Sequence, residues 1–102
     1  MPKTLHPSPR YFATFKSYRI PLVPKDEIEE AEAKQRTSYY IAQYDAQGQL
    51  IALEKRLNGE LEFRDEYEYW DGTSKLKLRR MIDPDGSVEE HRYDRRGRKL
   101  GE

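Results

Sequence analysis

Residues 44–50 read Tyr-Asp-Ala-Gln-Gly-Gln-Leu, and residues 93–100 read Tyr-Asp-Arg-Arg-Gly-Arg-Lys-Leu. A third Asp-x-x-Gly pattern spans residues 83–86, and Asn58-Gly59 and Asp71-Gly72 mark two further turns. An Asp-x-x-Gly sequence is typical of a tight hairpin turn in which glycine supplies the left-handed residue. Because the turn glycines recur every 11 to 14 residues, they predict an antiparallel β-meander.

The expected fold class is therefore mainly β, an antiparallel meander of six or seven strands with one short helix. Alternating apolar residues predict a strand over residues 11–22. Asp26 followed by Glu29 resembles a capping box, which predicts a short helix over residues 26–36. The remaining strands are predicted near residues 38–45, 49–56, 60–70, 75–83, 87–94 and 98–101.

The start of the chain differs in composition from the rest. Its first nine residues hold three prolines, which predicts a flexible segment over residues 1–10. The length of 102 residues allows one domain, which we place over residues 11–102.

Turn lengths also predict which residues face each other across the strands. We favour three-residue loops at residues 46–48 and 57–59, because a two-residue Asn58-Gly59 turn sets Leu53 against Arg64. The expected partners are Ile41 with Leu53, Leu53 with Phe63, Tyr69 with Leu76, and Ile82 with Val88. This register gathers one apolar face, which must be covered by the N-terminal strand and helix, by curling of the sheet, or by a second copy of the chain.

The turns carry a resemblance to known β-repeats. Residues 44–50 and 93–100 resemble YD repeats, whose core reads Tyr-Asp-x-x-Gly-Arg-Leu, and residues 81–88 form a weaker copy. Gln49 departs from that pattern, since arginine is usual there. Residues 39–100 also resemble the Asn-Gly-rich repeats of YwqK-type antitoxin-like proteins. The resemblance implies a β-sheet scaffold in a small bacterial protein, with a toxin-neutralising or partner-binding role and no catalytic residues.

Composition and motifs argue against several kinds of chemistry. The chain has no cysteine, which excludes disulfides and thiolate sites, and no run of 18 apolar residues, so we expect no membrane association and a cytoplasmic location. The two histidines, His6 and His91, have no neighbours at metal-ligand spacing, and no serine or glycine motif marks a nucleophile or a phosphate loop. We therefore expect no enzyme, no metal and no cofactor.

The leading functional hypothesis is a small protein-binding module. The face opposite the apolar one is expected to carry paired charges and aromatic side chains, of the kinds that anchor interfaces. The residues expected to bind an unknown protein partner are Tyr40, Tyr44, Arg64, Trp70 and Arg79.

Two alternatives remain open. One is a structural homodimer formed through the apolar sheet face. The other is nucleic-acid binding by a basic cluster with an aromatic residue inside it, which is disfavoured because the net charge is zero and the middle of the chain is acidic. That cluster consists of Arg92, Tyr93, Arg95, Arg96, Arg98 and Lys99.

Overall fold

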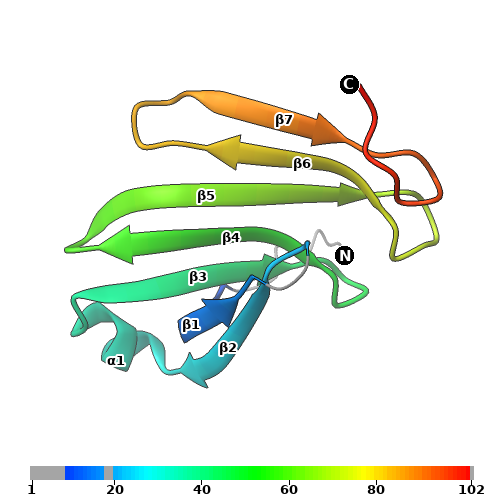
Figure 1. Ribbon diagram of the computed structural model, residues 1–102. Coiled ribbons are helices and arrows are strands. Elements are labelled where there is room, and N and C mark those ends of the chain that lie inside the picture. The colour runs from blue at the N-terminus through cyan, green and yellow to red at the C-terminus, as the bar shows by residue number, and fades with distance from the viewer. Residues whose placement is uncertain (1–8, 18–19, 102) are drawn as a thin grey trace, which may run out of the picture.

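The regular turns place most of the chain in one antiparallel sheet, as the computed structural model of residues 9–17 and 20–101 shows (Figure 1). The sheet has seven strands in the order β2-β1-β3-β4-β5-β6-β7. The strands are β1 (Arg10–Lys16), β2 (Val23–Ile28), β3 (Ser38–Tyr44), β4 (Leu50–Leu57), β5 (Glu60–Tyr69), β6 (Leu76–Ile82) and β7 (Val88–Arg92). The mainly β fold with one short helix, α1 (Glu30–Lys34), is thus confirmed. Only β3 to β7 form a meander, because β1 lies between β2 and β3.

The N-terminal part departs from prediction. Strand β1 ends at Lys16, and a second strand occupies residues 23–28, where the helix was expected to begin. The predicted capping box is wrong, since Asp26 lies within β2 and the N-cap of α1 is Glu29, which makes no side-chain cap hydrogen bond. Pairing with β1 outweighs the local helix signal, and an edge strand tolerates Pro24. The predicted flexible segment falls mostly outside the described residues, although Arg10 opens β1.

The opposite end of the chain also differs. No strand forms over residues 98–101; the chain makes one isolated bridge between Tyr93 and Lys99, and Leu100 N–H donates to Arg92 O. Leu100 stays 48% exposed, so this segment buries too little apolar surface to extend the sheet. The sheet reaches seven strands because β2 is present, not because the C-terminal segment adds a strand.

Each of the three central hairpins contains a β-bulge, and the bulges correct the predicted register. The Tyr69–Leu76 and Ile82–Val88 pairs are confirmed, but Ile41 lies opposite Glu54 and Leu53 lies opposite Asp65. The predicted three-residue loop at residues 57–59 is wrong: Leu57 pairs with Glu60, so the turn consists of Asn58 and Gly59 alone. The register then shifts between Gln43 and Tyr44, Lys55 and Arg56, and Glu68 and Tyr69. A bulge adds one residue to one strand, which turn length alone does not predict.

One face of the sheet, here called the inner face, holds the hydrophobic core, and the N-terminal hairpin covers part of it. Strand β1 pairs with β3 only through residues 10–12 and then diverges from it. The ring centroid of Phe15 consequently lies 6.1 Å from that of Phe63 on β5. Leu22, which follows β1, donates its N–H to the Tyr67 hydroxyl of β5 at 3.2 Å. Of the three expected ways to cover the apolar face, the structure therefore shows packing of the N-terminal segment against it. The core consists of Phe12, Leu22, Ala42, Leu50, Leu53, Tyr67 and Leu76.

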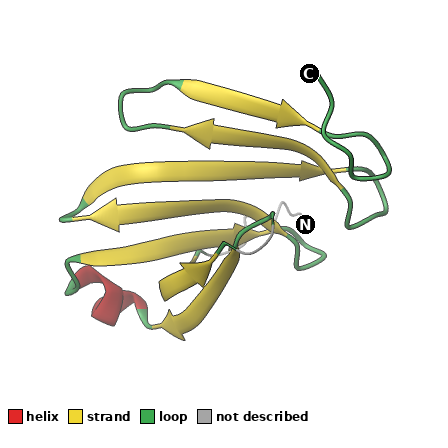
Figure 2. Cartoon of the chain, in the orientation of Figure 1, coloured by secondary structure: helices red, strands yellow, loops and turns green. Residues whose placement is uncertain are grey.

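Helix α1 lies at one end of the sheet, beside β1 and β3 (Figure 2). Its buried residue is Ala33. Within the part of the chain that the structure describes, no helix has the length and apolar character needed to span a lipid bilayer.

Candidate functional site

The residues predicted to bind a protein do not share a face. Tyr40 and Tyr44, expected beside the charges, pack against the core on the inner face. Arg79 also lies on the inner face, where its Nε and Nη2 donate to Asp65 Oδ2 at 3.0 and 2.7 Å. Arg64 alternates with Phe63 and Asp65 along β5 and so points to the opposite, outer face. Because the first two rings belong to the core, the predicted common surface is wrong in this respect.

Arg64 belongs to a ladder of alternating charges that crosses the outer face. Arg64 binds Glu54 on β4 at 2.7 Å and Glu66 on its own strand at 2.8 Å. Arg80 on β6 continues the ladder, binding Glu66 at 3.2 Å and Glu90 on β7 at 3.1 Å. Burial opposes ionisation of Glu66, but hydrogen bonds from the two arginines outweigh it and lower its pKa. Since each charge already has a partner, the ladder stabilises the sheet rather than offering an unpaired anchor.

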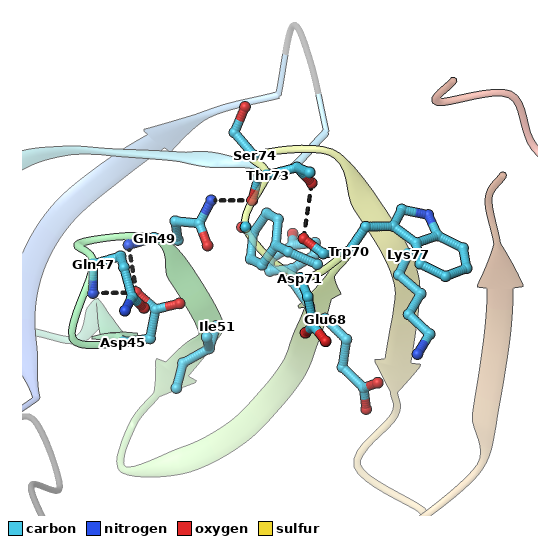
Figure 3. Close-up of a pocket in the computed structure, with 13 residues that line it drawn as sticks. Asp45, Gln47, Gln49, Ile51, Glu68, Trp70, Asp71, Thr73, Ser74 and Lys77 are labelled. Carbon is cyan, nitrogen blue, oxygen red and sulfur yellow. Dashed lines mark hydrogen bonds between the residues drawn. The ribbon is translucent and has the colours of Figure 1, made fainter. Parts of the chain in front are cut away.

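Trp70 lies where three turns meet at one end of the sheet. The turns at residues 45–49 and 70–75 and the C-terminal turn over residues 93–99 gather there (Figure 1). Gln49 Nε2 donates to Thr73 O at 2.9 Å and links the first two turns (Figure 3). Figure 3 shows the Trp70 indole beside the Lys77 side chain, directed away from the turn that holds Asp45.

Two cations lie against the Trp70 ring. Lys77 Nζ of β6 is 5.0 Å from the ring centroid, and Arg95 Cζ of the C-terminal turn is 4.3 Å from it. The turn is held in place because Tyr93 N–H donates to Lys77 O at 3.0 Å. Cations at this distance from an indole are attracted by the ring quadrupole. Strand β5, strand β6 and the C-terminal turn thus converge on one aromatic side chain.

The convergence joins residues of two separately predicted sites. The sequence places Trp70 among the residues expected to bind a protein and Arg95 in the nucleic-acid alternative. The signal that links them is the β6–β7 register, which pairs Leu78 with Arg92 and so brings Tyr93 to Lys77. The predicted Ile82–Val88 register, continued along both strands, places Tyr93 opposite Lys77.

A shallow depression of about 530 Å³ lies beside the Trp70 ring. A larger pocket of about 750 Å³ lies on the side of the 45–49 turn, and Trp70 contributes to both. The larger pocket has the carboxylates Asp45, Glu68 and Asp71 and the cation Lys77 in its lining (Figure 3). The depression is mainly basic, with three arginines and the carboxylate Asp94. We call the basic side the Trp70 surface; it consists of Trp70, Lys77, Asp94, Arg95, Arg96, Arg98 and Leu100.

The charges of the basic cluster are only partly neutralised. Arg92 binds Glu90, and Arg98 binds Asp94, whose pKa is lowered mainly by the hydrogen bond from the Arg98 backbone N–H. Among the described residues, Arg95, Arg96 and Lys99 have no carboxylate within ion-pair distance. Tyr93 packs against the core rather than standing free between the arginines.

Trp70 also holds an unsatisfied donor. Its Nε1 is buried and has no hydrogen-bond partner, the one such side-chain atom in the described ranges 9–17 and 20–101. A buried N–H without an acceptor costs about 1–3 kcal/mol. The Trp70 surface therefore combines an unpaired donor with two arginines, Arg95 and Arg96, that form no ion pair with any described residue.

Comparison with known proteins places the chain in a family. A family of unknown function, DUF6156, matches residues 4–102. The chain belongs to this family. No curated protein and no solved structure matches it, so the resemblance to YD repeats and YwqK-type proteins stays a prediction. Nor do the described residues of this family member contain a group of three or more side chains arranged to hold a metal ion.

Proposed function

We propose that this member of the DUF6156 family is a non-enzymatic protein-binding module, and that its Trp70 surface recognises an acidic segment of a partner. The observation that carries the proposal is the Trp70 ring flanked by Arg95 and Lys77 at the edge of an open basic depression. Tryptophan and arginine are the residues most enriched among interface hot spots.

The chemistry of the surface favours a partner with carboxylates and an apolar side chain. Arg95, Arg96 and Lys99 supply positive charge, and none of them forms an ion pair with a described carboxylate. Leu100, 48% exposed, supplies apolar surface in the same depression. Arg95 is an exposed side chain at the Trp70 ring, so its guanidinium can bind a partner carboxylate beside the ring.

Nucleic acid is the second candidate for the same surface, because unpaired arginines beside an aromatic ring also suit single-stranded nucleic acid. Two observations favour a protein instead. Lys77 and Arg95 occupy positions over the Trp70 ring where a base would stack, and Tyr93 packs against the core.

The homodimer alternative loses its main support, since the N-terminal hairpin covers part of the inner face. The toxin-neutralising role rests on the resemblance alone and stays a prediction.

Trp70 is the only tryptophan of the chain, so its fluorescence reports on the proposed surface directly. The test is a titration with a peptide of alternating glutamate and phenylalanine, and with the same peptide carrying glutamine for glutamate. We expect the acidic peptide to change the Trp70 emission and to bind more weakly as salt is raised. Equal binding of the two peptides contradicts the proposal.

A matched pair of charge reversals locates the site. Arg96→Glu reverses an unpaired charge in the depression, and Lys25→Glu reverses an exposed charge on β2. We expect Arg96→Glu to weaken the acidic peptide about tenfold, equivalent to about 1.4 kcal/mol, and Lys25→Glu to leave its affinity unchanged. Equal losses in both variants contradict a local site. Tighter binding of a single-stranded oligonucleotide than of the peptide would favour the nucleic-acid alternative.

A further inference from the structure

A separate hollow lies on the inner face, away from the Trp70 surface. It has a volume of about 340 Å³ and is formed by residues of the N-terminal hairpin and of strands β5 and β6. This volume is at the small end of the range for ligand pockets, about 300–1,000 Å³. The hollow, here called the Asp65 groove, is lined by Phe15, Ser17, Leu22, Phe63, Asp65, Arg79, Met81, Ile82 and Asp83.

A buried carboxylate stands among these mostly apolar walls. The Asp65 side chain is 5% exposed and is paired with Arg79, whose side chain is 18% exposed. Burying an ion pair costs desolvation free energy that the pair itself often fails to recover. The pair is therefore weak evidence for stability, and it places a carboxylate inside a mostly apolar hollow.

The hydrogen bonds of Asp65 are distributed unevenly between its two oxygens. Oδ2 accepts from Arg79 Nε, Arg79 Nη2 and the Tyr67 hydroxyl. Oδ1 accepts no hydrogen bond from any residue that the structure describes. It is also not completely shielded from solvent, in contrast to the unpaired Trp70 Nε1. Because Asp65 lines the groove, Oδ1 is open to it and has room for a donor.

We propose that the Asp65 groove binds a small, neutral, apolar molecule that carries one hydrogen-bond donor, such as a phenol. The apolar part contacts Phe15, Phe63 and Met81, and the donor reaches Asp65 Oδ1. A neutral ligand is favoured over a cation because Arg79 already neutralises Asp65 and would repel a second positive charge.

The test compares phenol with anisole, which has the same ring but no hydroxyl hydrogen to donate. Each is titrated into the full chain, labelled with ¹⁵N, and amide shifts are followed by NMR. We expect phenol to give saturable shifts at Asp65, Arg79 and Met81, and to bind about tenfold more tightly than anisole. Equal affinities, or shifts that do not centre on the groove, overturn the proposal.

Two variants separate the groove from the remaining surface. Met81→Trp fills the groove from β6, and Val88→Trp adds the same side chain at a residue that is 52% exposed and outside the groove lining. We expect Met81→Trp to abolish the phenol shifts and Val88→Trp to retain them; retention in both overturns the proposal. The comparison of phenol with anisole remains decisive if Met81→Trp does not fold. The outcome is independent of the acidic-peptide titration, because the lining of the groove contains neither Trp70 nor any residue of the C-terminal turn.

Discussion

Tyr67 connects the N-terminal hairpin to the centre of the sheet through its hydroxyl group. The hydroxyl accepts from Leu22 N–H at 3.2 Å and donates to Asp65 Oδ2 at 3.0 Å. Burial raises the pKa of Tyr67 well above its usual value, so the hydroxyl remains protonated and can donate at neutral pH. A single buried oxygen therefore joins two segments that are 45 residues apart.

We predict that Tyr67→Phe lowers the free energy of unfolding by about 1–2 kcal/mol, because Leu22 N–H loses its acceptor and Asp65 loses a donor. Tyr44→Phe is the matched control, since Tyr44 also packs against the core but its hydroxyl makes no side-chain hydrogen bond within the described residues. Urea unfolding of both variants is the measurement. A loss for Tyr44→Phe as large as that for Tyr67→Phe would show that the Tyr67 hydroxyl bridge contributes nothing specific.

At the scale of elements, the turns were predictable and the bulges were not. The Asp-x-x-Gly pattern identifies turns closed by hydrogen bonds such as Gly48 N–H to Asp45 O, at 3.0 Å. The predicted register holds next to the Gly72 turn, as for Tyr69 and Leu76, and shifts at the bulge one residue beyond it. Across β6 and β7 the predicted register holds throughout, whereas at Asn58-Gly59 the predicted loop length itself is wrong. A bulge depends on packing across strands, which a turn motif does not encode.

The choice of turn at residues 58 and 59 follows from backbone conformation. Asn58 and Gly59 have φ angles of 53° and 82°, as a two-residue type I′ turn requires. We predict that Gly59→Ala lowers the unfolding free energy by about 1 kcal/mol, because alanine is strained in the left-handed region. Since a Cβ at Gly59 would meet no atom within 4 Å, the loss is conformational. Asn58→Gly, which also accepts positive φ, should change thermal stability much less; equal losses in the two variants would contradict this account.

The outer-face ladder makes the stability of strands β4 to β7 depend on pH. Because the pKa of Glu66 is lowered in the folded state, its contribution to stability is present above the unfolded pKa of about 4.3 and is lost as pH falls through the folded value. We predict that Glu66→Gln lowers the unfolding free energy by about 1 kcal/mol at pH 7, and that the difference from wild type disappears at low pH. Glu62→Gln, at an exposed position on the same strand, should show little effect at any pH. A difference that persists below pH 3 would exclude ionised Glu66 as its cause.

At the scale of the whole molecule, the sequence predicted a lean β-sheet with an apolar face but left open what covers that face. The answer depends on where β1 diverges from β3, which brings Phe15 to Tyr40 and Phe63 with ring centroids 5.1 and 6.1 Å apart. The candidate site was likewise predictable only in separate parts. Trp70 and Arg95 were each singled out, but their contact depends on three turns meeting at one end of the sheet.

We predict that Phe15→Ala partly uncovers the inner face, lowering the unfolding free energy by about 2 kcal/mol and increasing the binding of a hydrophobic dye. Ile41→Ala removes an apolar side chain of similar burial from the outer face and should leave dye binding unchanged. Dye fluorescence below the unfolding transition is the measurement. An equal increase in both variants would mean that the hairpin is not the cover of the core.

The central claim is that Trp70 and the C-terminal turn form one recognition surface. The most direct measurement is an NMR titration of the ¹⁵N-labelled chain with the acidic peptide, following the Trp70 indole N–H together with every backbone amide. The account predicts a saturable shift of the indole signal and amide shifts concentrated at Lys77 and over residues 93–100. An unmoved indole signal, or shifts centred on another part of the sheet while the peptide binds, would contradict it.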